Sequence, residues 1–474
     1  MRRVLLRLLP LLAAASIVAL AGSPALAAGP SNADIIYTAN PPHVLVSSNG
    51  VVPHDVPYCS SANPSVVSLI CYSPEFIRTA YNVPSNLDGA GQTIVIVDAY
   101  GSPTIRQDLA TFDTTFGIAA PPSFQVLCPL GCPTFNPRNA KLDEVGWSEE
   151  TTLDVEWSHA IAPGANIVLD VAPSPAGNSI NAVEAAAIRM FPGSIMSQSF
   201  GTPEAAIHAN NAQLLQAEAN YAAAKQADIT VFASAGDSGA TNGTSFANAG
   251  FPASDPLVTA VGGTEGNPYE PVGSSGFSCS GSTCSTGLVT FSGTCSVGPR
   301  PGVPSGCKPT GYGAEEVWNE GAPIDAATGG APSLLFPVPS YQEGLGLTSR
   351  TIPDVSYNAA VDGGVLAAYS ALGTPLWVVF GGTSAGSPQW AAIAALANQA
   401  RASAGLGPLG FLNPRLYTLA ESTSYGNDFH DITVGNNQLT GTPVGFSAAT
   451  GYDAASGWGT PDVANLVSDL AATP

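Results

Sequence analysis

Residues 93–98 read TIVIVD, a run of apolar and mostly β-branched side chains that ends in an acid. A short apolar run without polar alternation indicates a strand that is covered on both faces. Other short, predominantly apolar runs of this kind lie at residues 165–171, 194–199, 229–234, 257–261 and 377–380. We therefore expect these segments to form the buried strands of one mostly parallel sheet.

Alanine-rich stretches with helical character separate several of these runs, at residues 182–189 and 204–226. Alternation of strands and helices predicts an α/β fold: a doubly wound, mostly parallel central sheet flanked by helices. Residues 265–312 interrupt the pattern, because they are rich in Gly, Ser and Pro and contain four of the eight cysteines. We interpret them as a loop insertion braced by disulfides.

The chain is acidic, with 474 residues and a formal net charge of −21. This charge argues against nucleic-acid binding and against recruitment to membranes by basic clusters, since both need Lys and Arg. At about pH 3–4 many carboxylates take up protons and their mutual repulsion fades. The composition therefore has two interpretations: the protein works in acidic surroundings, or its negative charge serves only solubility.

The amino terminus predicts export. Residues 1–27 begin with Arg2, Arg3 and Arg7, continue as an apolar run and end in small residues, as secretory signal peptides do. An uncleaved anchor is the alternative, but the run is short for a membrane span. We expect a secreted, extracellular protein. Its short N-terminal segment, residues 28–72, should have little core of its own and precede a main domain of residues 73–474.

Export would place the cysteines in an oxidising compartment. In sequence they are neighbours: Cys59 and Cys71, Cys128 and Cys132, Cys279 and Cys284, Cys295 and Cys307. Pairing of neighbours is the simplest hypothesis, although eight cysteines allow about 105 connectivities. A zinc site is less favoured, because no histidine lies near a cysteine pair at the spacing of a zinc finger.

A candidate nucleophile, Ser384, lies in residues 380–388, with the sequence FGGTSAGSP, between a predicted strand and an alanine-rich helix. The N–H groups at a helix N-terminus can hold an oxyanion there, although a lone serine before a helix is more often only its cap. No histidine lies in a setting like that of subtilisin-like enzymes, and an imidazole would stay protonated in acid. A carboxylate is the matching base.

Glu150 and Asp154 supply such carboxylates, four residues apart on one face of a predicted helix. Two acids on a buried face repel each other unless they share a proton, and a solvated acidic face is the alternative. Asp237 follows a strand within residues 232–239, FASAGDSG. A protonated acid at that edge of the sheet can donate a hydrogen bond to an oxyanion, although Asp also forms turns.

Residues 150–154 (ETTLD), 234–239 (SAGDSG) and 382–388 (GTSAGSP) resemble, in the same order, the signatures of the sedolisin family of serine-carboxyl peptidases. Residues 91–100 and 352–356 agree, so the resemblance spans about Ser73 to Asp462. It implies a subtilisin-like fold and endopeptidase activity at acid pH. The roles that it implies are nucleophile for Ser384, general base for Glu150, orienting acid for Asp154 and oxyanion partner for Asp237.

The resemblance also implies that the segment Ser199, Phe200 and Gly201 pairs with the substrate backbone, and many members have Trp where this chain has Phe200. It further implies a calcium loop, since hard cations prefer oxygen ligands. The Ca²⁺ ligands would be the Asp431 and Asp453 side chains and the carbonyls of Ile432, Ala449 and Gly451.

Two other functions stay open on sequence alone. A subtilisin-like Ser-His-Asp protease would have its optimum near or above neutrality and a histidine beside Ser384. A catalytically inactive extracellular binding protein on the same scaffold would not bring Glu150, Asp154 and Ser384 together. The favoured reading expects protein or peptide substrates, no nucleic acid, no membrane contact after signal cleavage, and a monomer. Sedolisin-family members commonly carry a larger folded propeptide than residues 28–72 could form.

Overall fold

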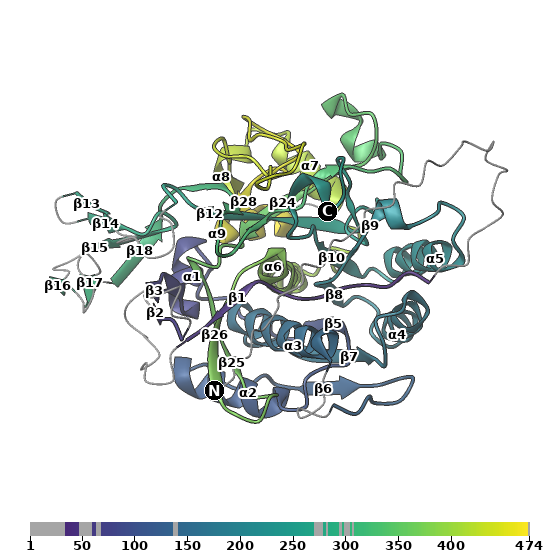
Figure 1. Ribbon diagram of the computed structural model, residues 1–474, viewed down its shortest axis with the longest axis horizontal. Helices are drawn as coiled ribbons and strands as arrows, with labels where there is room; N and C mark the ends of the chain where they lie inside the picture. The colour runs from purple at the N-terminus through teal and green to yellow at the C-terminus, as the bar shows by residue number, and fades with distance from the viewer. Residues whose placement is uncertain are drawn as a thin grey trace, which may run out of the picture.

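A central eight-stranded sheet organises the chain (Figure 1). The computed structural model describes residues 34–46, 59–62, 68–135, 141–269, 278–280, 283–292, 296–297, 304–305 and 308–472, so the predicted signal peptide lies outside the described residues. The strand order is β19-β12-β10-β8-β5-β7-β6, and β24 also pairs with β12. The strands are β5 (Thr93–Ala99), β6 (Phe124–Leu127), β7 (Asn166–Ala172), β8 (Ile195–Gln198), β10 (Thr230–Ser234), β12 (Thr259–Gly266), β19 (Glu315–Val317) and β24 (Val355–Asn358).

All neighbours in this sheet are parallel except β19, which runs antiparallel to β12. Helices cover both faces of this sheet. Successive side chains of a strand point to opposite faces, so each strand contributes to two separate cores. In β5, Ile94 and Ile96 pack into a core that includes α3 (Leu142–Ile161) and α6 (Thr383–Ser403). Val95 and Val97 pack into a second core with α4 (Gly177–Met190) and α5 (Ala212–Gln226). The predicted doubly wound α/β architecture is therefore confirmed.

One expected member of the parallel sheet lies elsewhere. Residues 377–380 belong to β26 (Leu376–Phe380), which is antiparallel to both of its neighbours in a separate sheet of order β1-β26-β25-β4. The other strands of that sheet are β1 (His43–Leu45), β25 (Gly364–Tyr369) and β4 (Cys71–Tyr72). Val379 packs on one side of β26 while Val378 and Phe380 pack on the other. Burial on both faces explains why its sequence resembles that of a central strand.

Much of the predicted insertion forms strands rather than loops. The strands β13 (Ser278–Ser280), β14 (Thr283–Ser285), β15 (Val289–Ser292) and β18 (Lys308–Tyr312) make an antiparallel sheet, which lies to one side of the central sheet in Figure 1. Their alternation of Thr, Ser and Val is half-polar, as expected for a sheet with one solvated face.

The disulfides Cys59–Cys71 and Cys128–Cys132 join sequence neighbours, as predicted. Cys284 is also disulfide-bonded, whereas the side chains of Cys279, Cys295 and Cys307 lie outside those described. In the described part of the chain, no helix is both long and apolar enough to cross a bilayer.

The early residues 34–46 pack along the main domain. Ile35, Tyr37 and Ala39 are buried in the core that contains α4 and α5. Val44 and Val46 join a smaller cluster with Leu69 and Val379. These early residues therefore share hydrophobic clusters with residues far later in the chain.

Candidate active site

Ser384 lies in the first turn of α6, directly after β26, and only 5% of its surface is exposed. The chain enters this helix through Gly382, whose φ of 87° is in the region that favours glycine. A Cβ at this position would lie 2.6 Å from Oδ2 of Asp237 and 2.9 Å from Cδ of Pro42. The lack of a side chain at Gly382 therefore allows the segments that contain Asp237 and Pro42 to lie close to the start of α6.

Glu150 and Asp154 lie on α3, which packs against α6, and both side chains are completely buried. Every residue of α3 from Gly146 to Ile161 is buried, so the alternative of a solvated acidic face is wrong. The structure thus brings together the acids and the serine that the sequence suggested as partners.

Burial raises the pKa of Glu150 well above its usual range, and the neighbouring charges of Asp154 and Asp98 raise it further. The Ser384 hydroxyl acts in the opposite direction and lowers this pKa by interacting with the carboxylate. Neither Glu150 oxygen has a partner with good hydrogen-bond geometry among the described residues, so this contact with Ser384 is a loose one. Burial also raises the pKa of Asp154. Such a cluster keeps protons at a pH at which isolated carboxyls have lost them.

Asp98 is a site residue that the sequence reasoning missed. It lies on β5, is completely buried, and its charge raises the pKa values of both Glu150 and Asp154. Burial raises the pKa of Asp98 as well, while the Thr151 hydroxyl lowers it. The available signal was an acid in an otherwise apolar strand, next to the carboxyl edge where sites form in α/β sheets.

Asp237 follows β10 and is anchored by Thr383, the residue before Ser384. Its Oδ1 accepts hydrogen bonds from the Thr383 N–H (2.8 Å) and hydroxyl (2.9 Å). The Thr383 hydroxyl oxygen also accepts from the Gly236 N–H at 3.0 Å. Burial raises the pKa of Asp237. The turn therefore holds a carboxyl beside Ser384 and leaves its Oδ2 on the Gly382 side.

The segment Ser199–Gly201 follows β8 and lies beside the nucleophile. The Ser199 hydroxyl is 3.4 Å from the Ser384 carbonyl oxygen. A cleft of about 300 Å³ is lined by this segment together with Asp237 and Ser384. Phe200 is buried. The centroid of its ring lies 4.9 Å from the ring centroid of Tyr37 and 5.6 Å from that of Trp147.

No described histidine is a partner of Ser384. His43 lies 3.7 Å from Glu149, and His159 lies 3.2 Å from Asp113. The ring of His430 stacks on Tyr312, and His208 is exposed. The remaining histidine, His54, is outside the described residues. Among the described residues, the base available to Ser384 is a carboxyl group.

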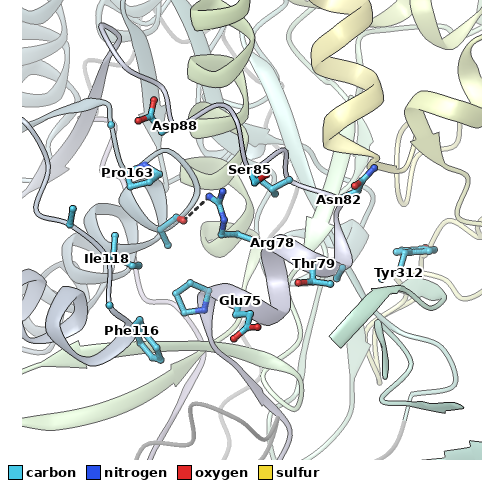
Figure 2. A pocket seen from close by; sticks show the side chains of 18 of the residues that line it. Glu75, Arg78, Thr79, Asn82, Ser85, Asp88, Phe116, Ile118, Pro163 and Tyr312 are labelled. Carbon is cyan, nitrogen blue, oxygen red and sulfur yellow. Dashed lines mark hydrogen bonds between the residues drawn. The ribbon is translucent and has the colours of Figure 1, made fainter. Parts of the chain in front are cut away.

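A larger cavity than this cleft, about 980 Å³, is at a different place, the C-terminal end of α3 (Figure 2). Phe116 and Tyr312 line it, and Arg78 of α1 (Pro74–Ala80) projects into it. Nη1 of Arg78 donates to the carbonyl oxygens of Ala160 (3.2 Å) and Ile161 (2.6 Å). Arg78 therefore caps the α3 dipole, and the lining of this cavity includes no predicted catalytic residue.

The predicted calcium ligands come from two loops that meet. Oδ1 of Asp431 accepts from the Tyr425 hydroxyl (2.8 Å) and the Gly451 N–H (3.1 Å), and Oδ2 of Asp453 accepts from the Ala449 N–H (2.9 Å). Within the described chain, the carbonyls of Ile432, Ala449 and Gly451 accept no hydrogen bond. No cluster of three acidic, imidazole or thiol groups occurs among the described residues, so carbonyls must complete such a site. The donor set fits a hard cation.

The comparisons with known proteins agree with this geometry. The model of the subtilase family matches residues 146–415, which include the four predicted catalytic residues. The chain is 33% identical to kumamolisin of Bacillus sp. (strain MN-32) over 84% of this chain and 63% of that protein. It is 29% identical to tripeptidyl-peptidase 1 of Bos taurus over 68% of this chain and 51% of that protein. The chain thus spans less than two thirds of the length of either relative.

Among solved structures, the fold is similar to that of a Pseudomonas sedolisin, a serine-carboxyl proteinase complexed with two molecules of pseudo-iodotyrostatin. The TM-score is 0.65 at 25% identity, and the match covers 84% of this chain and 98% of that one. The chain therefore belongs to the subtilase family, and within it to the sedolisin group of serine-carboxyl peptidases.

Proposed function

We propose that this protein is a secreted endopeptidase that hydrolyses proteins in acid, with Ser384 as its nucleophile and Glu150 and Asp154 as its base system. The observation that carries the proposal is the buried carboxyl cluster beside Ser384. Among the described residues, no imidazole is a partner of Ser384. A carboxylate can act as the base in acid, because its pKa is low, whereas a histidine would hold its proton at that pH.

In the proposed reaction the Ser384 oxygen attacks the carbonyl carbon of the scissile peptide bond, and Glu150 takes the hydroxyl proton. Glu150 then gives that proton to the leaving amine, and an acyl-enzyme remains. Water attacks the acyl carbon in a second step with the same group as base. Asp154 acts through Glu150, because a proton held on Asp154 removes repulsion that would disfavour the Glu150 carboxylate, whereas the charge of Asp98 keeps the Glu150 pKa raised.

The oxyanion requires a donor, and Asp237 is the residue proposed for it. Thr383 binds Oδ1 of Asp237, so a proton on Oδ2 would point away from those two donors. The raised pKa of Asp237 favours the protonated, donating form in acid. The N–H groups at the start of α6 supply further positive potential.

Protein or peptide substrates fit the cleft because its wall is an extended segment. Residues 199–201 can pair with a substrate backbone as an added strand, which requires no particular side chain. The monomeric state and the absence of nucleic-acid and membrane partners remain part of the same proposal. Export through residues 1–27 would place the enzyme outside the cell.

Calcium is proposed as a structural ion. The Asp431 and Asp453 carboxylates and the carbonyls of Ile432, Ala449 and Gly451 would hold it. A divalent cation there would neutralise the two acidic side chains and tie together the loops that carry them. The site takes no part in the proposed chemical steps.

The proposal is tested by a pH–activity profile on a denatured protein substrate for the wild type, Ser384→Ala, Glu150→Gln and the control Glu149→Gln. Glu149 is the adjacent acid of α3 and faces His43. We expect an acid optimum, a loss of about 10³-fold or more for the first two variants, and a change of less than about threefold for the control. An optimum at or above neutrality that survives Glu150→Gln would contradict the proposal.

A further inference from the structure

The cavity of about 980 Å³ at the C-terminal end of α3 shares no lining residue with the cleft that holds Ser384 (Figure 2). Its lining comes mainly from α1 and the turn that follows it, from the turn after α2 (Ile105–Phe116), from residues 160–164 and from the end of β18. Ligand pockets usually have volumes of about 300–1,000 Å³. The cavity is therefore large enough for a small organic ligand or for the end of a peptide.

Arg78 provides the positive charge in the lining of this cavity. Its Nη1 donates to the carbonyl oxygens of Ala160 at 3.2 Å and Ile161 at 2.6 Å. Its Nε and Nη2 have no hydrogen-bond partner among the described residues. Within that part of the chain, no carboxylate forms an ion pair with Arg78. The edge of the guanidinium that Nε and Nη2 form is therefore available for a ligand.

The charge of Arg78 is only partly compensated. The C-terminal end of a helix carries roughly −0.5 elementary charge, so α3 offsets about half of the charge on the guanidinium. Burial lowers the pKa of Arg78, because water is partly excluded from the charged form, but the guanidinium keeps its proton at acid and neutral pH. An anion in the cavity would offset this loss of solvation. The free edge matches the two oxygens of a carboxylate.

The acidic residues of the lining do not serve as that anion. Oδ1 of Asp88 accepts from Nε2 of Gln399 at 3.0 Å, and Oδ1 of Asp462 accepts from Nδ2 of Asn82 at 2.9 Å. Glu75 lies three residues before Arg78 on α1, but its side chain is exposed and forms no ion pair with it. Two of the three acids are thus engaged by neighbouring amides, and the guanidinium edge stays open.

The walls around the guanidinium are apolar and aromatic. Figure 2 shows Phe116, Ile118 and Pro163 on one side of Arg78 and Tyr312 on the other. The Tyr312 ring stacks on the ring of His430, with 3.6 Å between the centroids, so this wall is held in place by the protein itself. A ligand that joins a carboxylate to an apolar or aromatic group would therefore contact both the charge and the walls.

We propose that this cavity is a second binding site of the protein, for a carboxylate that is attached to an apolar or aromatic body. Arg78 binds the carboxylate, and Phe116 and Tyr312 contact the body. The C-terminal end of a peptide and a small aromatic acid both carry this chemistry. The site does not depend on the proposed function, because its lining includes no proposed catalytic residue.

The test measures binding to the full chain by isothermal titration calorimetry at about pH 5, where a C-terminal carboxylate is ionised. The Ser384→Ala background prevents cleavage of the probes. The probes are acetyl-Ala-Ala-Phe with a free carboxylate, the same peptide as its amide, and 3-phenylpropanoate. We expect the peptide acid to bind about tenfold or more tightly than the amide.

Arg78→Gln should remove this difference, because the amide side chain has no charge and no guanidinium edge. Arg106→Gln is the matched control. Arg106 is exposed and donates to the Phe124 carbonyl at 2.9 Å, outside the cavity lining. In the control, the affinity for the peptide acid should stay within about twofold of the parent.

A second pair of variants leaves Arg78 unchanged. Ser85 is exposed and lines the cavity, so Ser85→Trp places a ring in the space for the ligand. Asn86→Trp is the control, because Asn86 is the exposed neighbour outside the lining. Ser85→Trp should weaken binding of the peptide acid about tenfold or more, and Asn86→Trp by less than about twofold. The thermal midpoint of each variant shows whether it is folded.

The three probes separate the outcomes. Tighter binding of the peptide acid than of 3-phenylpropanoate supports a peptide end as the ligand, and the reverse order supports a small aromatic acid. Equal affinity for the peptide acid and its amide would overturn the site. So would an affinity for the peptide acid that neither Arg78→Gln nor Ser85→Trp changes, because the peptide would then bind elsewhere, for example in the cleft beside residue 384.

Discussion

Thr383 and Asp237 are joined by two hydrogen bonds, from the backbone N–H and from the hydroxyl of Thr383 to one carboxyl oxygen of Asp237. Thr383 immediately precedes Ser384, so this pair links the proposed oxyanion partner to the proposed nucleophile. The Thr383 hydroxyl additionally accepts from the Gly236 N–H. One small side chain at the start of α6 thereby sets the position of a carboxyl in the turn after β10.

Thr383→Val should therefore lower kcat/KM without unfolding the protein. The variant keeps the shape and the backbone N–H but loses the hydroxyl, which costs about 1–2 kcal/mol or about tenfold in rate. Thr383→Ser, which retains the hydroxyl, should restore most of the activity. The measurement is kcat/KM on a peptide substrate, with the thermal midpoint as a check on folding. Equal rates for the valine and serine variants would show that the hydroxyl has no positioning role.

Asp98→Asn should move the acid limb of the kcat/KM profile to lower pH, by about one unit. The Asp98 charge raises the pKa of Glu150, so its removal lets Glu150 ionise at lower pH. Asp170→Asn is the control, because Asp170 is a buried acid of the adjacent strand β7 that does not act on the Glu150 pKa. If the pH profile of Asp98→Asn does not move, or if it moves equally in Asp170→Asn, Asp98 does not belong to the base system.

Chelation of Ca²⁺ should destabilise the protein. If the ion binds only the folded state, its removal lowers the thermal midpoint by about 5 °C or more. Asp453→Asn should remove most of the difference between calcium and chelator, whereas Asp325→Asn, at an exposed position, should preserve it. The measurement is differential scanning calorimetry. Identical midpoints with calcium and with chelator in the wild type would count against the proposed site.

Stability should fall between about pH 4 and pH 7. Burial raises the pKa of Asp255 to about 7, and that of Glu184 to about 7. A carboxyl whose folded pKa is raised binds its proton more tightly in the folded state. Its contribution is therefore complete below the unfolded pKa and is lost as pH rises through the folded pKa.

Asp255→Asn tests this directly, since an amide cannot ionise. The fall in unfolding free energy from pH 4 to pH 7 should be smaller in the variant by a few kcal/mol, on the order of 1.4 kcal/mol per unit of pKa shift. Asp228→Asn, at an exposed position, should leave the fall unchanged. Denaturant titrations at each pH provide the values. A variant as sensitive to pH as the wild type would exclude Asp255 as a cause.

Sequence reasoning predicted the central strands well, because continuous apolar runs such as residues 93–98 report burial on both faces. The same signal failed for residues 377–380, since a strand buried in a second, antiparallel sheet has the same pattern. It also could not reveal Asp98 as part of the carboxyl cluster, because no spacing along the chain relates β5 to α3. The path of residues 34–42 was equally hidden, as it depends on contacts with Gly201 and Gly381 far along the chain.

The disulfide between Cys59 and Cys71 has a consequence for any maturation of the chain. A cut before residue 59 frees everything upstream, including β1 and residues 38–40, which line the cleft, except for what noncovalent pairing retains. A cut between residues 59 and 71 leaves both pieces as one covalent molecule. Migration with and without a reducing agent would distinguish the two kinds of nick, and only the first can release its fragment by dilution alone.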